Sequence, residues 1–473
     1  MSATGRKISV VTAAWLLGAA CVARPAPAAT HPDWPMFGWD AGRSSAPKVS
    51  MGIAASDLHA LRRQQVRIDG TVDASAIYLH GATVKGATHD VFFVTTTYGK
   101  TLAVDADHGT VLWEYTPSGY KSFAGTDQIT TATPVADPDR QHIYAASPDG
   151  MIRKLAVADG RVVWRRAITR LPSREKIASP LAYFHGGVIA VTGGYIGDAP
   201  PYQGHVAILD AGTGALLHVW NALCSDRHEL LDPTSCRQSD AAIWGRAGAV
   251  IDAATGHIFV ATGNAPWNGI DDWGDVVIEL NADATKILGN YTPRNTEKLN
   301  ATDRDLGSSA PVLTGGPFIV QGGKDGQLRV LDWRKMAGTE PHRGGASSRV
   351  PTPGDALLFT APAVLRRAAA TWIYVADNRG TSAWTLGAGK LQPRWHNSRA
   401  GTSPVVADGL LFVYDPHGEL RVYEAMNGRE LADLACGNGH WNSPIVADGR
   451  IVLPEGSANA HQTSGVLDIW RVR

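Results

Sequence analysis

The stretch GHIFVATGNAPWNG (residues 256–269) places a carboxamide and an indole directly after a strand of core quality. Its apolar run at 258–260 is typical of a buried β-strand. A tight turn would account for Gly263, but it would leave Asn264 and Trp267 unexplained. The structural alternative is that Asn264 occupies a left-handed turn position, which asparagine tolerates. The end of this strand is therefore the first candidate for site chemistry.

Other residue patterns that carry chemistry are sparse. Asp271 and Asp272 follow closely and offer two carboxylates to a metal ion, but we expect this loop between strands to be solvated. The chain has no G-x-S-x-G elbow, no histidine-rich metal spacing and no phosphate-binding loop. These absences disfavour the enzyme classes that depend on such motifs.

The composition favours a large β-rich core. The chain has 473 residues, 44% of them hydrophobic, with 51 glycines and 15 tryptophans. Charged residues make up 19%, below the usual quarter, which suits short strands and tight turns better than long solvated helices. Basic and acidic residues number 44 each, so the net charge indicates neither nucleic-acid binding nor attraction to an anionic membrane.

The N-terminus is typical of an export signal spanning residues 1–28. Arg6 and Lys7 precede an apolar run at 8–22, and the A-x-A pattern at 26–28 supplies a cleavage site. That run is short for a membrane span of roughly 20 residues, and no later apolar run is long enough to cross a bilayer. We expect an exported protein, periplasmic or secreted, without a transmembrane anchor.

The four cysteines predict one disulfide. Cys21 would suit a lipoprotein if Leu17 stood one place closer, so we disfavour lipidation. Cys224 and Cys236 close a short polar loop and are expected to pair in an oxidising compartment. A metal pair is the rival interpretation, but their spacing matches no metal motif. Cys436 is expected to be a small buried hydrophobe.

The remaining chain, residues 29–473, is predicted to be one domain of repeats. The clearest unit, residues 401–434, contains four short apolar or alternating runs separated by glycine-containing turns, which predicts a four-stranded antiparallel meander. A Thr/Ser-(x)-Pro pattern opens related units, at Thr133, Ser179, Ser309, Thr360, Ser403 and Ser443. A closing pattern such as LAVDADHGTVLW (102–113) recurs as well. Together they predict repeats that start near residues 84, 129, 176, 242, 305, 356, 401 and 440.

Eight small sheets that cannot bury both faces alone must stack, and radial closure into a propeller is the usual solution. The last repeat lacks a fourth strand, and an orphan run at 61–68 is patterned like one. Pairing the two would close the ring and remove a naked edge. The sequence therefore predicts an all-β, eight-bladed propeller of four-stranded antiparallel blades, closed by an N-terminal strand.

The repeat markers carry a family likeness. The pattern A-x-D-x-x-x-G-x-x-x-W, at Ala103, Asp105, Gly109 and Trp113, resembles the tryptophan-docking motif of pyrroloquinoline quinone (PQQ) propellers. WPMFGWDAGRS (34–44) is similar to the N-terminal lead of the same group. In the motif the indole wedges between neighbouring blades. Such blades occur in quinoprotein alcohol dehydrogenases and in outer-membrane-assembly propeller lipoproteins that bind no cofactor.

The resemblance to quinoprotein dehydrogenases implies roles for specific residues. Asn264 matches the amide that binds calcium beside PQQ, and an amide oxygen is a hard donor suited to that ion. ATDRDLGSSAPVL (301–313) resembles the segment of the catalytic base, which places Asp305 in that role with Asp303 as its alternative. Lys324 matches the cation that meets the quinone. Taken singly, each of these residues also suits an ordinary turn.

Several departures from the family pattern weaken that implication. The adjacent cysteine pair over the quinone is absent, and so is the glutamate expected to join Asn264 on calcium; only Asp198 offers a carboxylate there. Trp244 stands two residues from the expected position of the stacking tryptophan, which Arg246 occupies. No C-x-x-C-H motif is present, so no covalent haem is implied and electrons must leave for a separate acceptor.

Two functions are compatible with these features. The first is a periplasmic PQQ-dependent dehydrogenase with calcium that oxidises an alcohol or related hydroxyl compound, either a small molecule or a polymer. The second is a non-catalytic propeller that binds proteins. Asn264, Asp305 and Lys324 favour the first, whereas the missing glutamate and cysteine pair favour the second.

Overall fold

A computed structural model describes residues 1–2, 32–195 and 197–472. Apart from its first two residues, the expected export signal, with Cys21, lies outside this part of the chain. From Pro32 onward the chain forms one compact unit. Within the described residues, no helix has the length and hydropathy needed to cross a membrane.

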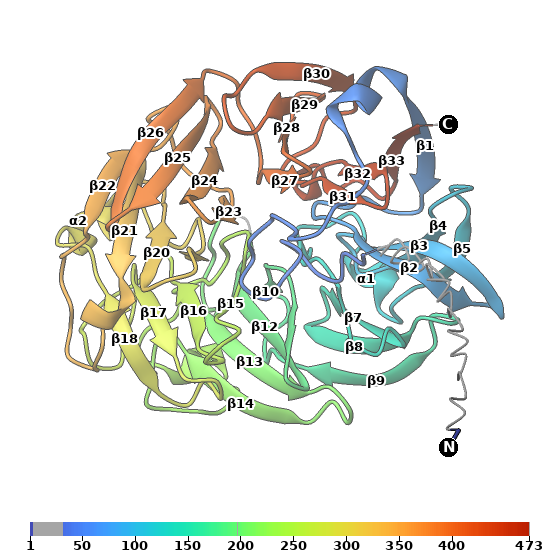
Figure 1. The fold of residues 1–473 in the computed structure, drawn as a ribbon. Helices are drawn as coiled ribbons and strands as arrows, with labels where there is room; N and C mark the ends of the chain where they lie inside the picture. Colours follow the sequence, from blue (N-terminus) through green and yellow to red (C-terminus); the bar gives the residue numbers. More distant parts are fainter. Residues whose placement is uncertain (3–31, 196, 473) are drawn as a thin grey trace. The chain divides into compact units, whose positions relative to one another are not determined.

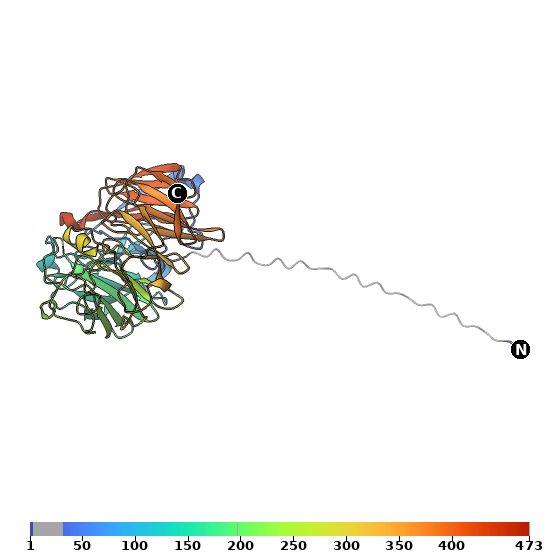
Figure 2. The same cartoon turned by 90° about the vertical axis from the view of Figure 1, so that its left-hand side faces the viewer.

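Eight antiparallel sheets stand around a common axis as the blades of a propeller, which confirms the predicted fold (Figures 1 and 2). Blades 1 to 4 contain β2 (Ile77–Val84), β3 (Ala87–Thr95), β4 (Thr101–Asp105) and β5 (Val111–Tyr115); β6 (Val135–Ala136), β7 (His142–Ser147), β8 (Met151–Ala156) and β9 (Val162–Ala167); β11 (Ala182–Phe184), β12 (Gly187–Gly194), β13 (His205–Asp210) and β14 (Leu216–Asn221); and β15 (Val250–Ile251), β16 (Ile258–Ala261), β17 (Val277–Leu280) and β18 (Ile287–Tyr291).

Blades 5 to 8 contain β19 (Val312–Leu313), β20 (Phe318–Gln321), β21 (Gln327–Asp332) and β22 (Ser348–Pro351); β23 (Ala363–Arg367), β24 (Ala370–Ala376), β25 (Thr381–Gly387) and β26 (Lys390–Asn397); β27 (Val405–Ala407), β28 (Leu410–Asp415), β29 (Glu419–Glu424) and β30 (Glu430–Ala435); and β31 (Ile445–Ala447), β32 (Arg450–Glu455), β33 (Gly465–Val472) and β1 (Leu61–Ile68). The first strand of each blade lies nearest the axis (Figure 1).

Two details differ from the expected repeats. Blade 1 begins at Ile77 rather than near residue 84, and β10 (Glu175–Ile177) adds a fifth strand to blade 3 by pairing with β12. The helical segments are short: α1 (Tyr120–Phe123), α2 (Thr296–Ala301), and the 3-10 turns η1 (Ala55–Ala60), η2 (Pro233–Ser235), η3 (Trp333–Lys335) and η4 (Ala458–Ala460).

The ring closes as the sequence predicts. β1 pairs antiparallel with β33 along its whole length, from Leu61 opposite Val472 to Ile68 opposite Gly465. Arg63 strengthens the junction, because its guanidinium donates to both carboxylate oxygens of buried Asp468, at 2.8 and 2.7 Å. The last blade therefore combines strands from both ends of the propeller and leaves β33 paired on both sides.

Neighbouring blades are held together by the tryptophans of the closing motif. Trp113, at the end of blade 1, donates its indole N–H to the carbonyl of Val157 in blade 2, at 2.8 Å. The ring lies against Gly160, where a Cβ atom would come within 2.6 Å of it. Trp164 and Trp395 make the same contact with the blades that follow them. A side chain at the glycine position would displace the indole, so the motif requires both residues.

The N-terminal segment 34–46, which we call the plug, crosses the end of the central channel. Backbone carbonyls of the plug accept hydrogen bonds of 2.8–2.9 Å from strands of blades 2, 4, 6 and 7, through Ala136, Ile251, Val364 and Val406. Trp34 exchanges two further backbone bonds with Tyr78 of blade 1. Arg43 is fully buried and donates to the carbonyls of Phe37 and Leu181, the latter next to blade 3. The plug thus joins six blades near the axis (Figure 1).

Candidate functional site

The chain segments that lead into the inner strands meet at the other mouth of the channel. There they line a cavity of about 310 Å³. Lining residues come from six blades, and those of blades 2, 3, 4, 6 and 8 include Thr131, Lys176, Trp244, Phe359 and Trp441. Asp303, before blade 5, and Lys324, in the turn between β20 and β21, complete this side of the wall. Because the plug bonds to the inner strands beyond these segments, the cavity and the plug occupy opposite ends of the channel.

Asp305 and Lys324 form a buried ion pair at the cavity wall. The Lys324 ammonium lies 2.7 Å from Oδ1 of Asp305, whose side chain is 1% exposed. The indole N–H of Trp244 donates to the other carboxylate oxygen at 3.2 Å. Burial raises the pKa of Asp305 above its usual value, against the opposing effect of Lys324. Burial lowers the pKa of Lys324, but Asp305 and Asp303 outweigh it and raise that pKa.

Asp303 and Asn264 extend this pair towards solvent. Asp303 accepts a hydrogen bond from the Asn264 amide at 2.6 Å and a second one from Lys324. Its side chain is 68% exposed and lines the cavity, whereas Asp305 lies behind it. Asp303 has a left-handed backbone (φ 52°) just after α2. It therefore also has the turn role that the sequence allowed for it. The structure therefore brings together all four residues that the resemblance selected in this region.

The carbonyl oxygen of the Asn264 side chain is available to bind a cation. It is buried and has no hydrogen-bond partner among the described residues. Asn264 is absent from the positive-φ residues, so the left-handed-turn explanation does not apply to it. A buried amide oxygen without a donor is costly, and calcium takes hard oxygen ligands of this kind. The residues present fit a metal at this position.

Asp198 lines the same cavity from the loop after β12. Burial raises the pKa of its carboxyl, and the nearby Lys324 opposes that effect. Tyr202 approaches this carboxylate as well, and burial raises the pKa of its phenol. Asp198 is thus placed on the cavity wall as a second possible oxygen ligand.

Trp244, Phe359 and Trp441 give the cavity an aromatic wall. Ring centroids lie 5.7 Å apart for the two tryptophans and 6.0 Å apart for Phe359 and Trp441, which are stacked. The Lys324 ammonium lies 5.1 Å from the Trp244 ring. Arg246 lies beside Trp441, with its guanidinium 5.3 Å from that ring centroid, and does not line the cavity. Such a wall suits a flat, conjugated ligand.

Sequence reasoning missed Lys176 and Asp275. Lys176 lies four residues before the proline of its repeat, and Thr131, Phe359 and Trp441 lie three before theirs. The residues just before each Thr/Ser-(x)-Pro pattern could therefore have been examined as cavity residues. Asp275 is fully buried and accepts a hydrogen bond at 3.3 Å from the backbone of Leu306, directly after Asp305. Burial raises the pKa of Asp275 to about 8. Asp275 is therefore mostly protonated at neutral pH, and its hydrogen bond positions the segment that carries Asp305. No sequence pattern indicated this role.

The disulfide loop supports the strand end that carries Asn264. Cys224 and Cys236 are joined, and Ser225 beside them bonds to the backbone of Asp271 and to the Trp273 indole. Asp272 is 8% exposed and accepts a hydrogen bond from Asn268, so this acidic residue is structural rather than solvated. Cys436 is half-buried, and burial raises the pKa of its thiol to about 12.

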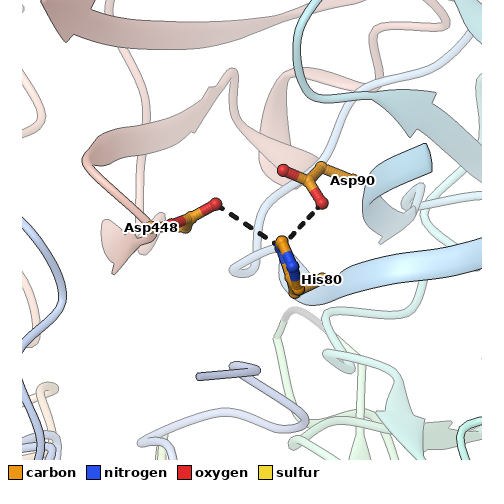
Figure 3. A group of neighbouring side chains, drawn as sticks. All are labelled: His80, Asp90 and Asp448. Atoms are coloured by element: carbon orange, nitrogen blue, oxygen red, sulfur yellow. Dashed lines mark ion pairs between the residues drawn. The ribbon is translucent and has the colours of Figure 1, made fainter. Parts of the chain in front are cut away.

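A second polar cluster lies away from the cavity and joins blades 1 and 8. His80 lies between Asp90 and Asp448, at 2.9 and 3.6 Å (Figure 3). Within the described residues these are the one group of three such ligands close enough to hold a metal ion. Arg450 already contacts both carboxylates, at 3.2 and 3.0 Å. Arg450 therefore supplies the positive charge that a metal ion would otherwise bring, and the cluster contributes to ring closure.

The propeller fold and its repeats identify the family of this chain. The family model PQQ_2, described as "Outer membrane protein assembly factor BamB", matches residues 54–230 and 369–465, more than half of the chain. The chain therefore belongs to this family of PQQ-like propellers.

Two relatives of this chain are named as dehydrogenases. A polyvinylalcohol dehydrogenase from Sphingopyxis sp. (strain 113P3) is 22% identical over 456 residues, which cover 82% of this chain and 68% of the relative. The quinohemoprotein alcohol dehydrogenase ADH IIB of Pseudomonas putida is 26% identical over 273 residues, 52% of this chain and 39% of the relative. The chain thus spans well under half of that second protein.

A solved structure supports the same architecture. The quinohemoprotein alcohol dehydrogenase of Comamonas testosteroni superposes with a TM-score of 0.69 over 93% of this chain and 80% of that one, at 17% identity. At this identity the match concerns the propeller fold alone.

Proposed function

We propose that the protein is a PQQ-dependent dehydrogenase that oxidises the hydroxyl group of an alcohol, either a small molecule or a polymer. The observation that carries this proposal is the buried Asp305–Lys324 ion pair beside the unpartnered amide oxygen of Asn264. Lys324 and Asp303 line the aromatic-walled cavity, and they contact the base and the Asn264 amide respectively. A propeller without a cofactor has no need for this combination, because burying an ion pair and an unpaired amide costs free energy.

The chain offers ligands for both expected groups. Asn264 would hold calcium, Asp198 on the cavity wall is a second candidate ligand, and the aromatic wall would hold the flat PQQ ring. When bound, PQQ supplies the two-electron acceptor and calcium supplies a Lewis acid. The absence of a C-x-x-C-H motif supports electron transfer to a separate acceptor rather than to a covalent haem.

Asp305 accepts the hydroxyl proton of the substrate in this proposal. Its burial raises its pKa and so makes its carboxylate a stronger base than an exposed aspartate. Lys324 and Trp244 hold both oxygens in place, and the ammonium favours the ionised form that a base requires. Asp303, which lines the cavity, is the alternative base. The enzyme acts after export, in the periplasm or outside the cell.

Reconstitution with PQQ and calcium tests the proposal. The purified protein is expected to acquire a quinone absorption band and dye-linked alcohol dehydrogenase activity. Asp305→Asn should retain the band and lose activity by about 10²–10⁴-fold, the usual contribution of a general base. Asp159→Asn, which alters an exposed turn carboxylate, is the control and should remain fully active. If Asp303→Asn loses activity and Asp305→Asn does not, Asp303 is the base.

The description of the family model favours one alternative, a non-catalytic propeller that binds proteins. That alternative requires neither cofactor nor base. A protein that acquires no quinone band with PQQ and calcium, at any ratio, would support it and exclude the dehydrogenase.

A further inference from the structure

Two buried cations lie beside the cavity without a full set of partners. Lys176, in β10, lines the cavity and is 7% exposed, and Arg246, in the segment before β15, is 1% exposed. Both belong to segments that lead into inner strands, in adjacent blades 3 and 4. Neither residue takes part in the Asp305–Lys324 pair.

The two cations have fewer hydrogen-bond acceptors than their side chains can use. Within the described part of the chain, the Lys176 ammonium makes no hydrogen bond or ion pair, and only the backbone of this residue is paired, opposite Gly193 of β12. Arg246 donates through one nitrogen to the carbonyls of Asp73 and Trp441, at 3.2 and 3.4 Å, and its other two nitrogens have no acceptor there.

The carboxylate of Asp73 does not resolve this surplus. It already accepts from the His440 ring at 2.7 Å and from the backbone of Trp441 and Ala458, at 2.9 and 3.0 Å. Asp198 acts on Lys176 only through its charge, which raises the pKa of the lysine. The cavity therefore keeps one lysine that no neighbouring carboxylate neutralises by contact.

Burying an unpaired cation is unfavourable unless an anion joins it. Burial lowers the pKa of Lys176 to about 8 and also lowers the pKa of Arg246, which is the expected sign of that cost. Lys324, the other cavity lysine, already has Asp303 and Asp305. The missing anion must come from a ligand that also contacts the aromatic wall.

We propose that Lys176 binds a carboxylate group of the planar ligand held against Trp244 and Trp441. The positive charge of Arg246, beside Trp441, adds to the attraction for this carboxylate. This inference rests on the proposed function, in which that ligand is PQQ, a tricarboxylate. Lys176 is a contact residue, and Arg246 is a positioning residue that acts through Trp441 and the local charge.

The test measures PQQ binding to the apoprotein by quenching of tryptophan fluorescence, with calcium present and without any substrate. Lys176→Met keeps the aliphatic stem and removes the charge, so PQQ affinity should fall by about 10- to 100-fold. Lys176→Arg keeps the charge and should stay within about 5-fold of the wild type. Lys154→Met is the matched control, since Lys154 is also buried but lies in blade 2 away from the cavity, and it should bind PQQ normally.

PQQ trimethyl ester separates charge recognition from other effects. The ester lacks the carboxylates, so wild type and Lys176→Met should bind it equally if the lysine acts on charge. Equal affinity of both proteins for PQQ itself would overturn the subsite while leaving the proposed function intact. If the wild type binds no PQQ, the proposed function fails; benzene-1,3,5-tricarboxylate is then the probe, and equal affinities for it would overturn the subsite as well.

Discussion

A buried acid directly precedes the cavity residue Lys176, and its ionisation opposes folding at neutral pH. Glu175, next to Lys176, is fully buried, and one of its carboxylate oxygens accepts from the backbone of Arg170 and Leu171. Its other oxygen has no partner among the described residues. Burial raises the pKa of Glu175 to about 7, and backbone hydrogen bonds, that of Leu171 first, only partly offset it. A similar effect of burial raises the pKa of Asp240 to about 6.

The sign of this effect gives a prediction for Glu175→Gln. Between pH 4.5 and about 7 the unfolded chain has lost the Glu175 proton and the folded chain has kept it, so wild-type stability falls as pH rises through this window. Glutamine keeps the acceptor and does not titrate. The variant should match the wild type near pH 4.5 and be more stable by up to about 3 kcal/mol at pH 8, at ~1.4 kcal/mol per unit of pKa. Urea unfolding at both pH values measures this, with exposed Glu430→Gln as control. A difference that does not change with pH would contradict it.

Residue types and order were enough to select Asn264, Asp303, Asp305 and Lys324, because the resemblance fixes their relative positions along three consecutive segments. Lys176 and Asp275 could not be selected in the same way. Their importance comes from burial and from what faces them across the fold, which neither a single lysine nor a glycine-aspartate pair reveals in the sequence. The choice between Asp303 and Asp305 as the base also needed coordinates, since only these show that one is exposed and the other buried.

At the scale of elements, the docking of tryptophan on glycine can be tested separately from backbone strain. Gly160 (φ 73°) and Gly186 (φ 82°) both have left-handed backbones, but an added Cβ would meet the Trp113 ring at Gly160 and nothing within 4 Å at Gly186. Alanine at either position should cost about 1–2 kcal/mol from the backbone alone. Gly160→Ala should cost about 1–3 kcal/mol more, because the indole must move. Thermal or denaturant unfolding of the two variants gives the difference, and equal losses would mean that the docked indole adds no stability.

The same elements show where repeat patterns suffice and where they do not. Turn glycines and alternating runs predicted the hairpins of every blade, since both patterns are local. The early start of blade 1 at Ile77 was missed because its first strand lacks the Thr/Ser-(x)-Pro opener. The extra strand β10 was missed because three residues, Glu175–Ile177, become a strand only by pairing with β12.

At the scale of the molecule, ring closure and the plug make the eight blades one cooperative structure. β1 closes the rim, and residues 34–46 tie six blades together at the axis. The alternation of β1 predicted the first contact, whereas the plug has no periodic pattern and gains its structure only from the strands it crosses. With the plug at one end, the candidate site opens at the other, and the space between Trp34, Phe37 and the neighbouring inner strands is only about 10 Å³.

Arg43 is the residue on which the plug can be tested. It is fully buried, and its guanidinium satisfies the carbonyls of Phe37 and Leu181 at 2.8 and 3.0 Å, although burial lowers its pKa to about 10. Arg43→Met fills similar space and leaves both carbonyls without a donor, which should cost about 2 kcal/mol or more. Because the plug joins blades rather than belonging to one, calorimetry should show a lower and broader transition, while PQQ affinity at the opposite mouth persists below it. Arg67→Met, on the exposed face of β1, is the control and should unfold like the wild type. An unchanged transition in Arg43→Met would mean that the blades hold together without the plug.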